Sequence, residues 1–226
     1  MPSSTPSSRS TGRATLRERH TALTRSVILD VARRQFADRG FAAAAVRPIA
    51  QEAGISLQTL YSAFGSKQGL LLALVDTVRE QTGGAEAREH VVQSDDPAEL
   101  IERAANLRRR IFEVCGDIIV TFREGAAGDS EVAAAYDAGQ RRMREGVDRM
   151  CGRLQELGAL RPGLTRREAA DQMAALFVAE IYEELTGPRS GWSPDQYERW
   201  LRDRLREALL DPARRPGSSP SADQRV

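Results

Sequence analysis

The sequence predicts an all-α protein in which a small three-helix N-terminal domain is joined to a larger helical domain. Almost no segment alternates polar and apolar residues with the period of two that is typical of strands, and the Val, Ile and Tyr clusters are embedded in helix-favouring Ala, Leu, Arg and Glu. A capping oxygen also precedes Glu or Gln by three residues at three places, which begin at Asp96, Thr165 and Ser193. These three places predict helix N-termini.

Apolar spacing and the capping signals predict helices at about 22–39, 45–53, 57–64, 67–81, 97–123, 130–158, 166–186 and 194–209. Pro97 and Pro194 stand at first helical positions, where the missing N–H group has no partner to lose. Gly116 and Gly139 mark candidate breaks in the two longest helices. Residues 83–95 are polar and lack a clear period, so we interpret them as a loop.

The composition of the chain suggests four segments. Residues 1–18 are rich in Ser, Thr, Pro and Arg, which predicts a disordered basic arm, and residues 211–226 have the same character and predict a disordered tail. Between them we expect a small helical domain at 19–68 and a larger helical domain at 69–210.

Charge is divided unevenly along the chain. Residues 1–68 contain nine Arg and one Lys against four acidic residues, a formal charge of +6, and the remaining residues carry −5, which together give the net charge of +1. A basic small domain joined to an acidic large one is typical of a DNA-binding protein with a second, non-DNA partner. The alternative is an uneven scatter of solvated Arg.

Other classes of protein are disfavoured by what the sequence lacks. No apolar run approaches the roughly 18 residues of a membrane span, and the first twenty residues contain no signal-peptide segment, which predicts a cytoplasmic protein without membrane contact. There is no arrangement of Ser, His and Asp for catalysis, no phosphate loop and no cluster of metal ligands, so we expect no enzyme, cofactor or metal. Cys115 and Cys151 are interpreted as packing residues, with a redox sensor as the alternative.

The segment 46–64 predicts two short helices that meet at a tight corner. Gly54 allows the chain to leave the first helix in a left-handed conformation, and Ser56 can cap the second helix. The inward positions are apolar: Ile49, Ala50, Ala53, Ile55, Leu60 and Phe64. This is helix-turn-helix geometry, in which the second helix lies in the major groove of DNA.

The outward face of the second helix is chemically suited to DNA. Gln58 can pair with adenine, Thr59 can contact a thymine methyl, and Tyr61 offers a hydroxyl to phosphate. Just beyond, Lys67 is the only lysine of the chain and stands at a helix N-terminus, where N–H groups and a cation form a phosphate site. Corners of this kind also occur in protein-interaction modules, so a helical interaction module without sequence-specific DNA binding is the alternative.

At this point the chain resembles the TetR (tetracycline repressor-like) family. The resemblance covers residues 24–76 and rests on ILDVARRQFADRGF and VRPIAQEAGISLQTLYSAFGSKQGLLLALVD, with Gly54, Tyr61 and the run from Phe64 to Lys67 at the most recognisable positions. It implies DNA contacts by Arg47, Ser56, Leu57, Gln58, Thr59, Tyr61 and Lys67. It further implies a homodimer on double-stranded, near-palindromic operator DNA, and a repressor that an unknown small-molecule effector releases. On this resemblance, residues 19–68 are the expected helix-turn-helix DNA-binding domain, and residues 69–210 are the expected helical ligand-binding and dimerisation domain.

Two departures from the family pattern concern the start of the first helix of the corner. Ala44 and Ala45 stand where a capping Thr is usual, and Pro48 falls in the first turn. Loss of the cap costs about 1 kcal/mol, and proline is tolerated only close to the beginning of a helix.

The larger domain resembles one TetR subgroup more weakly, through GALRPGLTRREAADQM and GWSPDQYERWLRDRLREALL. The resemblance implies a dimer interface on the last helices, with candidate residues Met173, Ile181, Trp200, Leu201 and Leu205. Apolar residues of the middle helices are candidates for a ligand pocket: Phe112, Cys115, Ile119, Phe122, Met143, Val147, Met150 and Phe177. Core packing is the alternative for both sets. Glu180 and Tyr182 could give the pocket polar contacts or face solvent.

Overall fold

The structure is a computed structural model that describes residues 16–81 and 84–212. Over these residues it is all-α, as predicted, with no strand beyond an isolated bridge between Leu160 and Leu210. The helices are α1 (Leu16–Ala43), α2 (Val46–Glu52), α3 (Leu57–Phe64), α4 (Lys67–Gln81), α5 (Gly84–Val92), α6 (Pro97–Ala126), α7 (Ser130–Glu156), α8 (Arg166–Leu176), α9 (Ala179–Thr186) and α10 (Pro194–Leu209).

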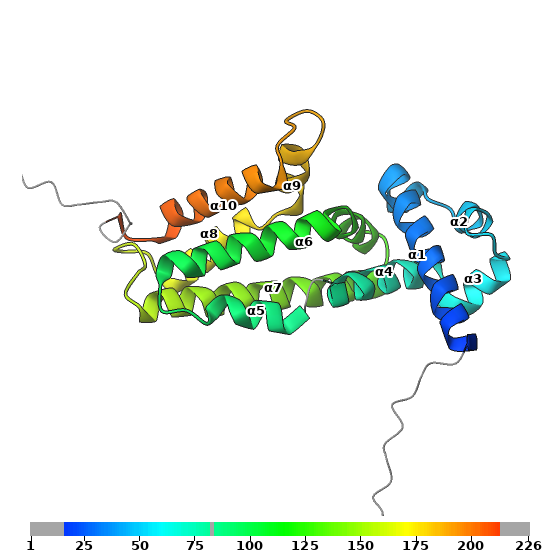
Figure 1. Cartoon of the computed structure of the whole chain (residues 1–226), viewed down its shortest axis with the longest axis horizontal. Coiled ribbons are helices and arrows are strands. Elements are labelled where there is room, and N and C mark those ends of the chain that lie inside the picture. The colour runs from blue at the N-terminus through cyan, green and yellow to red at the C-terminus, as the bar shows by residue number, and fades with distance from the viewer. Residues whose placement is uncertain (1–15, 82–83, 213–226) are drawn as a thin grey trace, which may run out of the picture.

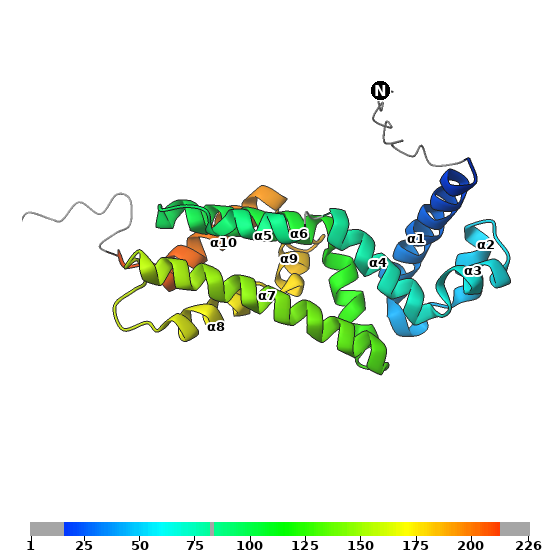
Figure 2. The ribbon, with the colours of Figure 1, turned by 90° about the horizontal axis from the view of Figure 1, so that it is seen from below.

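The molecule is elongated, with α1, α2 and α3 at one end and the larger helical domain extending to the other (Figure 1). Helix α4 leads from the small domain into the large one, and α1 packs directly against α6. After a quarter turn, α7 and α8 lie on one side of the larger domain, and α6 with α10 on the other (Figure 2). The small domain therefore projects from one end of a helical body.

Two apolar cores hold these parts together. One lies wholly within the larger domain and includes Leu100, Leu154 and Leu201. The other fills the small domain around α1, α3 and α4, and it also takes in Ile118 and Phe122 of α6. Because the second core includes residues from both sides of the predicted boundary at 68/69, the two domains are packed together rather than loosely tethered.

The three predicted capping sites all begin helices. Thr165 and Ser193 form complete capping boxes, in which the N-cap hydroxyl accepts from the third backbone N–H and the Glu or Gln side chain accepts from the N-cap. Asp96 accepts from the N–H of Ala98, but the carboxylate of Glu99 is used elsewhere: it accepts from Ser94 and Arg103.

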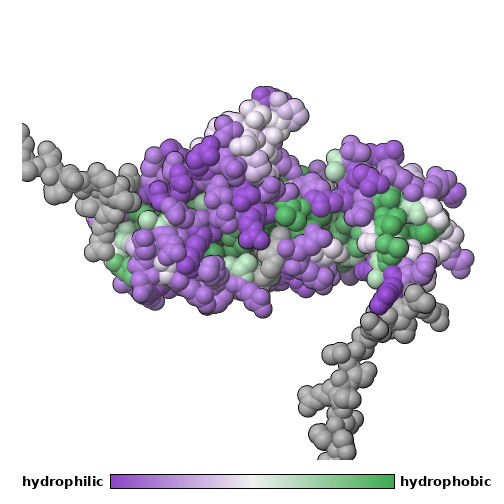
Figure 3. All heavy atoms as spheres, viewed as in Figure 1, coloured by the Kyte–Doolittle hydropathy of each residue, from purple (hydrophilic) through white to green (hydrophobic). Residues whose placement is uncertain are grey.

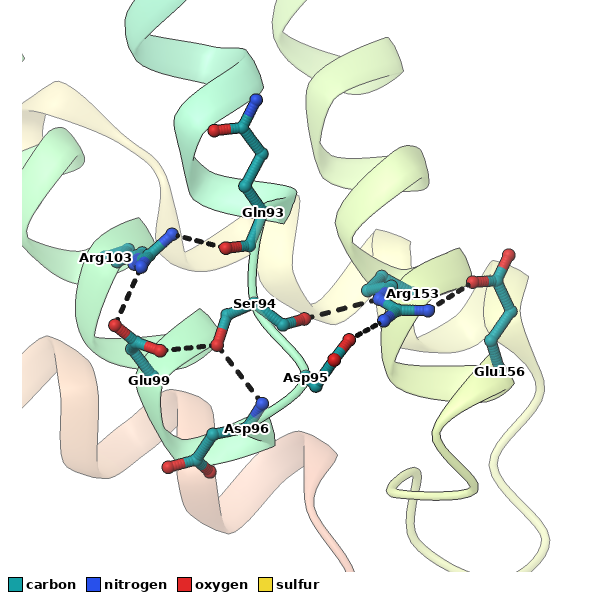
Figure 4. Close-up of polar contacts among 8 residues, drawn as sticks. All are labelled: Gln93, Ser94, Asp95, Asp96, Glu99, Arg103, Arg153 and Glu156. Carbon is teal, nitrogen blue, oxygen red and sulfur yellow. Dashed lines mark hydrogen bonds and ion pairs between the residues drawn. The ribbon is translucent and has the colours of Figure 1, made fainter.

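The segment 83–95 is not the predicted loop, because it contains α5. Arg103 donates to the carbonyls of His90 and Gln93, at 2.8 Å each, and thereby satisfies the C-terminal end of α5. Arg153 of α7 donates to the carbonyl of Ser94 at 3.3 Å and pairs with Asp95 (Figure 4). These partners come from other helices, so local periodicity does not reveal them.

Other helices also differ in part from the prediction. Helix α1 begins at Leu16, within the predicted arm, and extends to Ala43 across a non-helical Gly40. The predicted helix 166–186 is divided at Phe177, whose φ and ψ are −94° and 46°. Helix α7 is continuous through Gly139, whereas α6 has a non-helical residue at Cys115, beside the predicted break at Gly116. The rest of the predicted arm and tail, residues 1–15 and 213–226, lies outside the described residues.

The surface of the larger domain is predominantly hydrophilic in the view of Figure 3, and apolar surface gathers on the small domain. Leu23 and Val27 of α1 are among the exposed apolar side chains, at 63% and 41%. Within the described ranges, no helix combines the length and the hydropathy that a membrane crossing requires.

Candidate nucleic-acid interface and adjoining cavity

The corner between α2 and α3 forms as the sequence predicts. Gly54 has a φ of 69°, and the N–H of Ile55 donates to the carbonyl of Ala50 at 3.0 Å, which closes the turn. Ile49 and Leu60 are fully buried against each other's helices. Packing of these two side chains fixes α3 across α2 and leaves the opposite face of α3 outside the core.

The exposed face of α3 presents polar side chains from its first two turns. Ser56 caps the helix by accepting from the N–H of Thr59 at 3.0 Å, and the two hydroxyls lie 2.7 Å apart. Gln58, Thr59 and Tyr61 are exposed. Leu57 differs from the expectation of an outward residue, since it is half-buried and packs against the small-domain core.

The N-terminus of α2 lacks a side-chain cap, as its sequence predicts. Ala45 is the N-cap and makes no side-chain capping bond, and Pro48 is the third residue of the helix. The helix thus begins just before the proline, where the missing N–H is tolerated. Arg47, in the same turn, is exposed.

Polar contacts fasten α1 to the corner. Glu52, at the end of α2, accepts hydrogen bonds from Arg34 at 2.8 Å and Gln35 at 2.7 Å, which lower the pKa of its carboxyl. At the far end of α3, the guanidinium of Arg25 lies 4.5 Å from the centre of the Phe64 ring. The corner is therefore held in a fixed orientation on α1.

Lys67 has a role that the sequence did not indicate. Its ammonium donates to the carbonyl of Ala42 at 3.1 Å and lies 4.5 Å from the centre of the Phe41 ring. Burial beside these groups lowers the pKa of Lys67. Ser66 accepts from the N–H of Gly69 at 2.9 Å, so one donor of the predicted phosphate site is already satisfied within the chain. Lys67 thus joins α4 to the end of α1, and its remaining N–H donors can point outward.

The eight residues predicted to line a pocket all lie along one cavity of about 680 Å³ between α4, α6, α7, α8 and α9. Phe112, Met150 and Phe177 are buried there, and Met143 and Ile119 are half-buried. Glu180 also lines the cavity, and it forms an ion pair with Arg123. The cavity wall also includes arginines, which the spacing of apolar residues in the sequence does not indicate.

Tyr182 and the two cysteines occupy apolar surroundings. Tyr182 is buried, with its ring 4.9 Å from that of Tyr197, so it is not on the solvent face. Burial raises the pKa of Cys115 and of Cys151 to about 12. Both thiols stay protonated near neutral pH and are poor nucleophiles, which agrees with a packing role.

The candidate dimer-interface residues differ in how deeply they are buried. Met173, Leu201 and Leu205 are at most 1% exposed within the core of a single chain, so the alternative interpretation, intrachain packing, applies to them. Their inward direction follows from the pairing of α8 and α10 with α6 and α7, which a helical stripe alone does not specify. Ile181 and Trp200 are partly exposed and stay available to a partner.

Comparison with known proteins shows where this architecture recurs. Residues 28–74, from α1 into α4, match the model of the tetR family of bacterial regulatory proteins. The N-terminal domain of this chain is therefore of the TetR type. The matched segment includes each of the candidate DNA-contact residues, from Arg47 to Lys67.

The HTH-type transcriptional regulator TtgR of Pseudomonas putida is 25% identical to this chain over 100 residues, which are 44% of this chain and 45% of TtgR. The match thus spans less than half the length of this relative. The regulator PfmR of Thermus thermophilus has a TM-score of 0.68 at 22% identity, over 80% of this chain and 97% of its own.

A regulator from Saccharomonospora viridis, solved with choline, has a TM-score of 0.67 at 21% identity, over 84% of this chain and 99% of its own. Similarity at these identities establishes that the TetR fold extends over the larger domain as well. It does not transfer the choline of that complex to this chain.

Proposed function

We propose that this TetR-family chain is a cytoplasmic, DNA-binding transcription regulator that acts as a ligand-responsive repressor and binds a near-palindromic operator as a homodimer. The observation that supports this best is the corner itself. The apolar side chains of α2 and α3 are buried, while the exposed side chains of α3 are those whose chemistry suits base edges and phosphates.

Individual DNA contacts follow from the exposed groups. Gln58 is placed to hydrogen-bond adenine in the major groove, with Thr59 beside it, and these residues would discriminate between sequences. Arg47, Tyr61 and the outward donors of Lys67 would contact phosphates, which position the domain on any sequence. Ser56 supports this face by capping α3, and half-buried Leu57 offers at most an edge contact.

A ligand in the cavity could influence the small domain through one joint between α1 and α6. Arg33 of α1 binds Asp117 of α6 by two hydrogen bonds, of 2.8 and 2.9 Å, and it donates to the carbonyl of Val114 at 2.5 Å. Between these two partners lies Cys115, the non-helical residue of α6, whose side chain lines the cavity. A ligand that shifts this turn of α6 would therefore move the anchor of α1.

The proposed switch is a change in the spacing of two recognition helices. In a homodimer, the two α3 helices must lie about 34–36 Å apart, or somewhat more, to enter successive major grooves. A ligand that binds more tightly to a conformer with another spacing lowers operator affinity by the difference in its binding free energies. The partly exposed Ile181 and Trp200 are proposed as interface residues.

The first experiment is sequencing of genomic fragments retained by the purified protein at near-physiological salt. Enrichment of an inverted repeat is the expected result. Gln58→Ala should then relax the base preference, whereas Lys67→Ala should weaken all sequences alike. If a folded, dimeric protein retains fragments without any shared motif, and does so in the absence of added ligands, the chain is a protein-interaction module instead.

A further inference from the structure

We infer that the cavity of the larger domain takes a small organic anion, an acid group carried on an apolar body. This inference rests on the proposed function, in which the cavity receives the effector, and it adds the chemical class of that effector. It depends on the size of the cavity, the charge of its wall and the placement of one arginine, Arg108.

The apolar part of the cavity wall determines the size and the apolar character of the ligand that fits. A cavity of about 680 Å³ holds a molecule of the size of a medium-chain acid or a fused aromatic acid. The rings of Phe112 and Phe177 and the thioethers of Met143 and Met150 line it. These side chains provide dispersion contacts and polarisable surfaces, and they offer a bound molecule few hydrogen bonds.

The charged part of the wall is unbalanced. Five arginines line the cavity against two acidic side chains, a formal excess of +3. Both acids lie close to lining arginines, since Glu180 pairs with Arg123, and Asp171 lies 3.5 Å from Arg144. Arg79 pairs with Asp76, which does not line the cavity, so the wall and this neighbour together keep a formal excess of +2. The resulting electrostatic field disfavours the binding of a cation and favours the binding of an anion.

Arg108 is the arginine best placed to bind an acid group. It is half-buried, and its guanidinium carbon lies 4.1 Å from the centre of the Phe177 ring and 5.2 Å from that of Phe112. A guanidinium that lies over an aromatic ring is attracted to the ring face, and its planar fork of N–H donors matches a carboxylate. The aromatic rings thus hold the guanidinium of Arg108 at the cavity wall, where it can donate to a carboxylate.

The test is calorimetric titration of the full-length protein, without DNA, with ligands that share a body and differ in charge. Octanoate, octan-1-ol and octyltrimethylammonium form one series, and 2-naphthoate with 2-naphthol forms a second. We expect at least one anion to bind more tightly than its neutral counterpart, and octyltrimethylammonium to bind most weakly of its series. The preference should weaken as salt rises.

Three variants connect this preference with Arg108. Arg108→Met keeps the length and the stacking surface but removes the charge, and should weaken anion binding about ten- to hundredfold with little effect on the alcohols. Arg108→Lys should retain part of the anion preference. Arg110→Met, at an exposed position of the same helix that does not line the cavity, is the matched control and should bind like the parent.

Two results would overturn the inference. One is equal or weaker binding of both anions relative to their neutral counterparts, including no binding at all. The other is an anion preference that Arg108→Met and Arg110→Met leave equally intact. Either result concerns the cavity alone, because operator binding by the unliganded protein is measured separately. If the proposal of DNA binding is wrong, the enrichment of genomic fragments fails instead.

Discussion

At the scale of single residues, Gly69 occupies a place where no side chain fits. A Cβ atom at this position would lie 2.0 Å from the backbone carbonyl oxygen of Phe64, whereas one at Gly139 in α7 would meet nothing nearer than 3.9 Å. The absence of a side chain at Gly69 therefore permits α4 to start directly against the end of α3. The turn that carries Lys67 depends on this glycine.

Gly69→Ala should accordingly displace the α3–α4 turn. We expect a lower free energy of unfolding in denaturant titration and weaker binding to all DNA sequences. Gly139→Ala is the matched control, since the same methyl group enters a continuous helix with room for it, and it should stabilise the protein by about 0.5–1 kcal/mol. Equal effects of the two substitutions would contradict the close approach at Gly69.

Glu183 is a carboxylic acid whose ionisation opposes the fold. Burial, followed by the neighbouring charge of Asp117, raises its pKa above the usual value, so the folded state favours the protonated form. Its stabilising contribution is present below the pKa of the unfolded chain and is lost as pH rises through the folded pKa. At neutral pH the ionised carboxylate is a cost.

Glu183→Gln should thus raise the free energy of unfolding at pH 7, and this gain should shrink towards zero as the pH falls below the unfolded pKa. Glu184→Gln provides the comparison. Glu184 is exposed and forms a surface ion pair with Arg189, so its replacement should change stability by less than about 1 kcal/mol. A gain for Glu183→Gln that is the same at pH 4 and pH 7 would rule out ionisation as its cause.

At the scale of elements, the joint between α1 and α6 depends on one ion pair at the irregular turn of α6. The hydrogen bond with Asp117 raises the pKa of Arg33, and the two side chains are about one-third exposed. Removing Arg33 leaves Asp117 facing Glu183 and leaves the carbonyl of Val114 without this donor.

Arg33→Met should destabilise the protein by about 1–2 kcal/mol, and Asp117→Asn by less, because the amide can still accept from Arg33. A double-mutant cycle in urea measures the coupling, which we expect to be favourable. The effect on regulation should be larger: in Arg33→Met, a ligand that binds the cavity should no longer change operator affinity. If the response to ligand persists unchanged, coupling runs through α4 instead.

Elements that follow from local chemistry were predictable from the sequence, and those that depend on distant partners were not. The corner at Gly54 and the helix starts at Thr165 and Ser193 are coded within a few residues, and they form as predicted. Helix α5 depends on arginines of α6 and α7 that satisfy its end, so its polar sequence alone predicts a loop.

The same distinction applies to the candidate sites. The exposed face of α3 follows from its period, which local sequence reveals. The bond from Lys67 to Ala42, the stacking of Arg108 and the inward direction of Met173 arise only when separate helices meet. Sequence periodicity identifies which residues lie on one face of a helix but does not tell which neighbour that face will contact.

At the scale of the whole molecule, charge is separated along the long axis. Over the described residues, those up to 68 carry a formal +4 (eight basic against four acidic residues) and those from 69 to 212 carry −7 (20 basic against 27 acidic), and the small domain lies at one end of the elongated body (Figure 1). Such a dipole directs the basic end towards DNA and keeps the acidic domain away from the phosphates. In sequence, residues 1–15 precede the small domain and add Arg9 and Arg13 and no acidic residue.

The contribution of these two arginines can be separated from the helix-turn-helix by the salt dependence of operator binding. Each phosphate neutralised adds about 0.9 to the slope of log affinity against log salt concentration. Replacing Arg9 and Arg13 by Gln should therefore reduce the slope by up to about 2 per chain, with the preferred sequence unchanged. Arg141→Gln with Arg149→Gln removes the same charge from exposed positions of α7 and should leave the slope nearly unaltered. Equal slopes for the two double variants would mean that net charge, and not its position at the DNA-binding end, sets the attraction.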